Sequence, residues 1–282
     1  MGKRNIPGKY NYLPIELDLN EAHNFLEKEI NELESFKIDL LLRYKEHFNK
    51  DIFKNNADIL LILADINRFL YEYNFSLDHI YKDYRRLKKG VQGEEKVRDV
   101  IYSLVRKNKV ISNARLVIRG TSIENDFLII NEGGVYTVEV KNIGSYKDKL
   151  LIDEYGRLTR INSYGEICEQ GDILSQANRH VEYLEQFLNK EFNYKIPIHS
   201  YIVIASSIKV VNKSEFNILG VNQLQSSLLP SKKFLNKDQV ERVYTHFMNN
   251  VEKSKKYPFI NYKDILYKNY RIILSSIVNV TS

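Results

Sequence analysis

The chain of 282 residues has one cysteine, no tryptophan and only five prolines. Cys168 has no second cysteine to pair with, so an internal disulfide is excluded and we expect a reducing, cytoplasmic environment. The longest apolar run, residues 59–64, stops at Asp65 and is far too short to cross a bilayer, so we expect no membrane partner. No apolar segment follows residues 1–7, and we therefore expect no signal peptide.

Sequence motifs of several enzyme classes are missing as well. There is no Walker-type glycine loop, no cysteine cluster for zinc and no G-x-S-x-G motif. Lys and Arg outnumber Asp and Glu by 42 to 36, a net charge of +6 that suits a polyanionic partner without requiring one. The abundance of Ile, Asn, Lys and Tyr is typical of an AT-rich genome, which accounts for part of this basicity.

The first 89 residues predict a helical module. After an extended arm over residues 1–17, apolar residues spaced three and four apart predict a helix over residues 20–48, with Asn20 as its N-cap. A second helix is expected over residues 57–73, and Ser76 is expected to cap a third segment. An antiparallel hairpin or short coiled coil is the simplest arrangement. Two roles stay open for it: packing or homo-oligomerisation, and binding of a partner protein.

Residues 90–282 show a different pattern, in which helices and strands alternate. Strands are expected near residues 114–118, 123–130 and 135–141, followed by a hairpin over residues 150–161. Helices are expected over residues 172–188 and 237–248, on either side of a largely apolar strand at residues 197–205. The pattern predicts an α/β fold with a mixed central β-sheet flanked by helices, joined to the N-terminal helical module.

Three charged residues stand on the second and third of these strands. Glu139 and Lys141 project from the same face of their strand because side chains alternate. Asp126 lies on the preceding strand, and the glycine-containing turn at residues 131–134 predicts that the two strands form a hairpin. The three side chains should therefore meet. Two carboxylates and an amine are the composition of a Mg²⁺-dependent phosphodiesterase site.

Two further residues are candidates for the same site. Glu94 lies three residues before Val97, on the apolar face of a helix, where a carboxylate either reaches solvent at the helix start or serves a site. Gln176 and His180 share one face of the later helix, which could direct Gln176 at the hairpin. For His180, an ordinary core or surface histidine is the simpler interpretation.

The ordered motifs resemble the NERD (nuclease-related domain) family, which is similar to the PD-(D/E)XK nuclease superfamily. The resemblance covers roughly residues 88 to 205. It rests on Gly93-Glu94-x-x-Val97, the Asp126 strand, Glu139-Val140-Lys141-Asn142 and the helix that carries Gln176. It implies a restriction-endonuclease-like core. One departure is Asn125, where the family usually has an apolar residue; its side chain should point away from the site.

The resemblance also implies a role for each matching position. Asp126 and Glu139 would be metal ligands, and the carbonyl of Val140 often supplies another in this superfamily. Lys141 would orient or activate the attacking water. Glu94 and Gln176 would support the site. The implied cofactor is Mg²⁺, with Mn²⁺ as a substitute.

The expected function is therefore a Mg²⁺-dependent nuclease acting on nucleic acid, DNA before RNA, as an effector in a defence or DNA-processing system. The alternative is a catalytically silent nucleic-acid-binding or scaffolding protein that keeps the fold. Two basic clusters, at residues 82–89 and 253–271, could contact phosphates while their tyrosines stack on bases. The simpler interpretation is a solvated lysine face with tyrosines packed beneath it.

Overall fold

The computed structural model describes residues 15–48, 56–104, 108–118, 120–169, 173–268 and 271. The chain divides into two units, the first formed by Met1–Lys88 and Lys256–Ser282 and the second by Lys89–Lys255. The predicted domains, residues 1–89 and 90–282, differ from these units because residues 256–282 join the first. The division into domains at residues 1–89 and 90–282 stays a prediction. The expected arm lies outside the described residues except for its last three.

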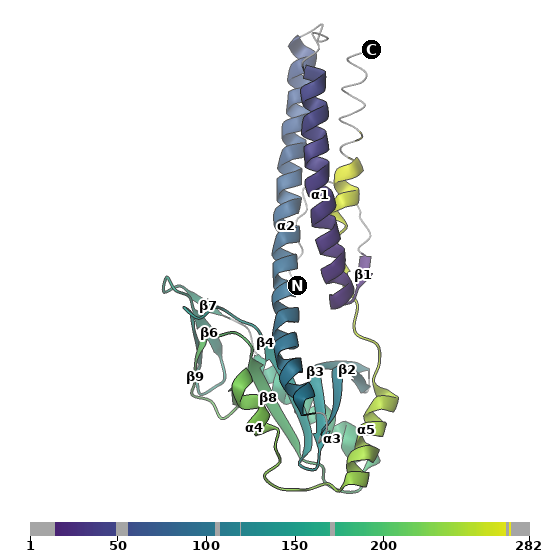
Figure 1. Cartoon of the computed structure of the whole chain (residues 1–282), viewed down its shortest axis with the longest axis vertical. Helices are drawn as coiled ribbons and strands as arrows, with labels where there is room; N and C mark the ends of the chain where they lie inside the picture. Colours follow the sequence, from purple (N-terminus) through teal and green to yellow (C-terminus); the bar gives the residue numbers. More distant parts are fainter. Residues whose placement is uncertain are drawn as a thin grey trace. The chain divides into compact units, whose positions relative to one another are not determined.

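The first unit is built on an antiparallel pair of helices, α1 (Leu19–Phe48) and the first part of α2 (Asn56–Ser103). The Tyr73 hydroxyl donates to the Leu33 carbonyl at 3.0 Å, and the Tyr84 hydroxyl donates to the Glu27 carboxylate at 2.9 Å. Later residues of α2 thus contact earlier residues of α1, and Figure 1 shows the two helices side by side. Their buried stripes form one apolar core that includes Ala22, Leu26, Ile30, Leu33, Phe69, Tyr73 and Ile80.

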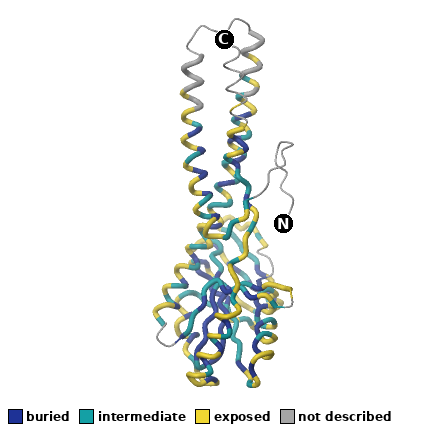
Figure 2. Tube along the Cα trace, turned by 90° about the vertical axis from the view of Figure 1, so that its right-hand side faces the viewer, coloured by how far each residue is buried: buried dark blue, intermediate teal, exposed yellow. Residues whose placement is uncertain are grey.

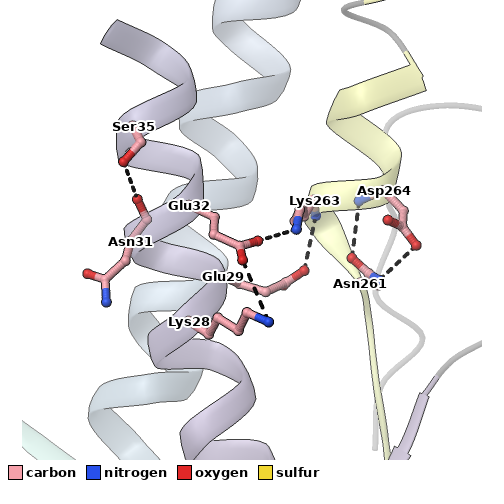
Figure 3. Close-up of polar contacts among 8 residues, drawn as sticks. All are labelled: Lys28, Glu29, Asn31, Glu32, Ser35, Asn261, Lys263 and Asp264. Atoms are coloured by element: carbon pink, nitrogen blue, oxygen red, sulfur yellow. Dashed lines mark hydrogen bonds and ion pairs between the residues drawn. The ribbon is translucent and has the colours of Figure 1, made fainter. Parts of the chain in front are cut away.

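The C-terminal segment completes this core. Strand β11 (Tyr257–Phe259) pairs antiparallel with β1 (Ile15–Leu17), and residues 262–268 are helical. Phe259, Tyr262 and Leu266 are buried in the same core as the two helices. Lys263 forms an ion pair with Glu32 of α1 (Figure 3). Phe259 and Tyr262 of the second basic cluster are therefore packed in the core, which favours the simpler of the two interpretations for these residues, whereas Tyr267 is exposed.

Two helix boundaries differ from the prediction. Asp18, and not Asn20, caps α1: its Oδ1 accepts from the Glu21 N–H at 2.8 Å, and the Glu21 carboxylate accepts from the Asp18 N–H at 3.0 Å. This reciprocal pair is a capping box. The expected break before Ser76 is also wrong, because α2 continues without interruption and Ser76 is buried inside it. No proline or glycine precedes Ser76 closely enough to stop the helix.

The second unit contains a mixed five-stranded sheet with the order β10-β8-β4-β3-β2. Its strands are β2 (Lys109–Ile118), β3 (Thr121–Asn131), β4 (Gly134–Lys141), β8 (Ile198–Ile204) and β10 (Asn217–Gly220). The first three pair antiparallel, whereas β8 runs parallel to both β4 and β10. The predicted α/β architecture, with a mixed central sheet flanked by helices, is confirmed.

Helices cover both faces of this sheet. On one face, Leu128, Ile130 and Val135 pack with residues of α3 (Ile173–Glu191) and α5 (Lys237–Asn250). On the other, Phe127, Ile129 and Val138 pack with the last turns of α2 and with α4 (Val221–Ser227). The sheet interior is accordingly dark blue in Figure 2. The two faces of β3 and β4 thus pack against different layers of helices.

A second, smaller sheet has the order β7-β6-β5-β9. It consists of β5 (Lys149–Ile152), β6 (Leu158–Ile161), β7 (Ile167–Glu169) and β9 (Lys209–Asn212). One face of this sheet packs on the start of α3. Its residues Leu150, Ile152 and Leu158 share a core with Ile173 and Leu174. Of the helices in the described part of the chain, none combines the length and apolar character that a bilayer span needs.

Candidate active site at the end of strand β4

The β3–β4 hairpin sets the positions of the predicted site residues. Gly134 has φ +128°, a conformation that side-chain-bearing residues rarely adopt, and its turn fixes the register Phe127↔Val138. Side-chain alternation then places Asp126 on the face of Leu128, which packs toward α3 and α5. Glu139 and Lys141 follow Val135 onto that same face. The hairpin therefore brings the three charged side chains to one side of the sheet.

The two strands stop pairing where the site begins. The antiparallel pairing of β3 with β4 ends at Phe127↔Val138, whereas β4 stays paired with β8 as far as Lys141↔Ile204. Two residues further along β4, the N–H of Val140 donates to Asp126 Oδ2 at 2.6 Å. A side-chain carboxylate thus satisfies a backbone donor of β4, and the Asp126 carboxylate is held against residue 140.

Glu139 connects the other residues of the cluster. Its Oε1 accepts a hydrogen bond from Lys141 Nζ at 2.6 Å and another from Gln176 Nε2 at 3.0 Å. The Glu139 side chain is buried, and Gln176 reaches it from the first turn of α3. A buried carboxylate that accepts two donors is fixed in position. The strand and the helix therefore hold a defined carboxylate–amine pair.

The carboxyl groups of Asp126 and Glu94 lie close enough to Glu139 to interact with it electrostatically. Burial raises the pKa of Asp126 well above its usual range, and the nearby Glu139 and Glu94 carboxylates raise it further against the opposing effects of the Val140 N–H and Lys141. The pKa of Glu94 is raised mainly by burial, opposed by Arg98 and increased by Glu139. Protonation of these acids, or a bound cation, would relieve the repulsion.

A comparison with known families finds a sequence match in this part of the chain. Residues 89–205 match the family model of the nuclease-related domain, NERD. The matched segment carries all of the predicted site residues and ends just beyond β8. Neither the curated proteins nor the solved structures gave a significant match. The segment is therefore similar in sequence to the nuclease-related domain, and the roles of its individual residues stay predictions.

The carboxylates of Asp126 and Glu139 suit a hard divalent cation that is bound by few protein ligands. Within the described residues, no three His, Cys, Asp or Glu side chains are grouped so as to hold a metal ion. Mg²⁺ is commonly held by one or two carboxylates and completes its shell with water and substrate phosphate. Asp126 and Glu139, with the carbonyl of Val140, match that smaller ligand set. Burial, followed by the charge of Glu139, raises the pKa of Asp126, and a bound cation would favour its ionised form.

Two residues of the matched segment lie within electrostatic reach of Glu139: Glu124, which had no predicted role, and His180, for which an ordinary histidine was the simpler interpretation. Burial raises the pKa of Glu124, with Arg115 as the main opposing charge and Glu139 adding to the rise. Burial lowers the pKa of His180, and Glu139 opposes that effect. The sequence offered one signal for Glu124: it stands two residues before Asp126 in the same expected strand, where regular alternation would give the two side chains a common face. His180 is buried, and its proximity to Glu139 depends on how α3 packs.

Alternation does not decide which face of β3 carries the Asn125 side chain, because Ile123 packs with the α3 and α5 core whereas Phe127 packs with the α2 core. The side chain is only 1% exposed, and neither its amide nitrogen nor its oxygen has a hydrogen-bond partner among the described residues. The departure from the family pattern thus buries an amide inside β3, and the expectation that its side chain points away from the site stays a prediction.

Proposed function

We propose that the nuclease-related domain is a Mg²⁺-dependent nuclease that hydrolyses phosphodiester bonds of nucleic acid, with DNA as the preferred substrate. The observation that carries this proposal is the convergence on Glu139. Lys141 and Gln176 both donate to one of its oxygens, and Glu139 is close enough to Asp126 on the neighbouring strand to raise the pKa of that carboxyl. The family match over residues 89–205 supports the reaction class.

Asp126, Glu139 and the Val140 carbonyl would hold the cation. When bound, Mg²⁺ would polarise the phosphodiester and lower the pKa of the attacking water. Asp126 is fixed for this role because the Val140 N–H binds its Oδ2, which leaves Oδ1 available as a ligand. Glu139 has the same arrangement, since its two hydrogen bonds use Oε1 and leave Oε2 available.

The remaining residues position the reactants. The ammonium of Lys141 can hold a water for in-line attack on phosphorus and screen the phosphate charge. Its hydrogen bond to Glu139 keeps it beside the carboxylate pair. Gln176 prevents Glu139 from rotating away from the site. Glu94 adds negative charge from α2, which strengthens cation binding.

A cleavage panel tests the proposal. Plasmid, linear duplex, single-stranded DNA and RNA are incubated with the full chain in Mg²⁺, in Mn²⁺ and in EDTA. We expect cleavage with either metal, none in EDTA, and a loss of at least about 100-fold in Asp126→Asn and in Lys141→Ala. Lys190→Ala, which removes an exposed lysine from the last turn of α3, is the matched control and should cleave normally.

Two results would decide against the proposal. Cleavage that survives both site substitutions would come from another site or from a contaminant. Metal-independent binding of nucleic acid without any cleavage would favour the alternative function, a binding or scaffolding protein that keeps the nuclease fold.

A further inference from the structure

The small sheet β7-β6-β5-β9 has one face that α3 covers and one that it does not. Leu150, Ile152 and Leu158 occupy the covered face. Side-chain alternation therefore places Lys149 and Leu151 on the opposite face. The register aligns Lys149 with Lys209 of β9 on one side and with Ile161 of β6 on the other. Lys149 and Lys209 are both exposed to solvent.

The charges on this outer face are unevenly distributed. Lys149 and Lys209 occupy directly paired positions on neighbouring strands, where like charges repel. Within the described part of the chain, neither ammonium forms an ion pair with an acid. The exposed Lys147 adds a third positive charge, while the acids Glu166 and Glu169 lie at the other edge, in and beside β7. The β5–β9 half of the face is therefore cationic at the starts of these strands, whereas Asp153, Glu154 and Glu215 lie beyond their other ends.

An exposed aromatic ring accompanies the lysines. Tyr146 is 71% exposed, and Lys147 Nζ lies 5.6 Å from the centre of its ring. An exposed ring beside several lysines is the combination with which proteins bind strands that have unpaired bases, because the ring stacks and the ammonium groups contact phosphates.

The cationic half lies at the same end of the fold as the proposed active site. Strands β4 and β8 run parallel and end together at Lys141 and Ile204. The connections that leave these ends lead directly to Lys149 at the start of β5 and to Lys209 at the start of β9. Hydrogen bonds hold the first connection, since Asp148 accepts from the Ser145 N–H at 3.0 Å. The lysines are thus placed along a path that begins at the acid–lysine cluster.

We propose that Tyr146, Lys147, Lys149 and Lys209 bind a nucleic-acid strand with unpaired bases and guide it to the site at the end of β4. The lysines contact consecutive phosphates, and Tyr146 stacks on a base. This inference rests on the proposed function, because it takes nucleic acid as the substrate. It adds a preference for single-stranded or locally opened substrate, which the acid–lysine cluster alone does not specify.

Binding in the absence of cleavage tests this surface. Full-length protein carrying Asp126→Asn is titrated in EDTA against a fluorescent oligothymidylate and against a duplex of equal length, at several salt concentrations. We expect the added pair Lys149→Gln and Lys209→Gln to raise the Kd for the single strand about tenfold or more and to reduce its salt slope by about 1.4, because two phosphate contacts are lost. Tyr146→Ala should weaken binding of the single strand more than binding of the duplex.

The matched control removes two exposed lysines elsewhere in the same unit. Lys190→Gln and Lys237→Gln change the net charge equally, from the last turn of α3 and the first turn of α5. An equal loss of affinity in this control would overturn the proposal, since net charge alone would then explain it. An unchanged Kd and salt slope in the Lys149 and Lys209 variant would also overturn it.

The two proposals can fail separately. If the wild-type chain cleaves nucleic acid while the Lys149→Gln and Lys209→Gln variant binds it normally, the proposed binding surface is wrong and the nuclease assignment stands. If binding depends on the lysines but Mg²⁺ produces no cleavage, the surface stands and the nuclease assignment fails.

Discussion

Glu29 gives the first unit a stability that should depend strongly on pH. Its side chain is 3% exposed in the core where α1 meets the C-terminal segment. One carboxylate oxygen accepts from the Lys263 N–H at 3.3 Å, and the other has no hydrogen-bond partner among the described residues (Figure 3). Burial raises the pKa from its usual 4.5 to about 7; Asp264 and Glu32 also raise it, while the N–H and ammonium of Lys263 lower it.

The direction of the effect follows from proton linkage. The folded state holds this proton more tightly than the unfolded chain, so the stabilisation is complete below pH 4.5 and is lost as the pH rises through about 7. The difference between 4.5 and about 7 corresponds to about 3 kcal/mol of unfolding free energy. Glu29→Gln mimics the protonated acid, because it keeps the acceptor for the Lys263 N–H and cannot ionise.

Urea unfolding of the full chain, followed by far-UV circular dichroism, measures this difference. At about pH 8.5 we expect Glu29→Gln to be more stable than the wild type by up to about 3 kcal/mol, and at about pH 4.5 to match it closely. Glu27→Gln is the control, since it removes the same charge from an exposed position of α1 and keeps an acceptor for Tyr84. It should change the stability by less than about 0.5 kcal/mol. Parallel pH curves for the wild type and Glu29→Gln would refute the reasoning.

Three further predictions concern the second unit. Gly93→Ala should destabilise it by about 1–3 kcal/mol in urea, because the new Cβ would lie 2.8 Å from the Cβ of Asn142. Gly90→Ala, with nothing within 4 Å, should instead stabilise α2 by about 0.5–1 kcal/mol, and shifts of the same sign would contradict the packing argument. In EDTA at about pH 8, Asp126→Asn should raise Tm by about 2 °C or more in differential scanning fluorimetry, since the raised pKa means that ionisation opposes folding; a lower Tm would contradict this. Gln176→Ala should reduce cleavage about tenfold while far-UV circular dichroism stays unchanged, because it removes one donor to Glu139, the proposed metal ligand; normal rates would rule out the proposed positioning role of Gln176.

The sequence was most informative where structure is local. Alternation along a strand places Glu139 and Lys141 on one face, and the glycine turn returns the chain beside Asp126, so their approach needs only the hairpin. The mixed sheet flanked by helices follows from apolar periodicities that each segment carries by itself. Glu124 lies outside the recognised motifs, although its position two residues before Asp126 in the same expected strand also makes it a candidate for the site.

The tertiary structure decided what depends on partners distant in the chain. The continuation of α2 through Ser76 follows from packing against α1, which a local capping signal does not reveal. The contact between Gln176 and Glu139 depends on where α3 lies on the sheet. The burial of Glu29 needs the segment around Lys263, which lies more than two hundred residues later in the chain. Local preferences thus determined which side chains share a face, and only long-range packing determined which were removed from water and which charges they met.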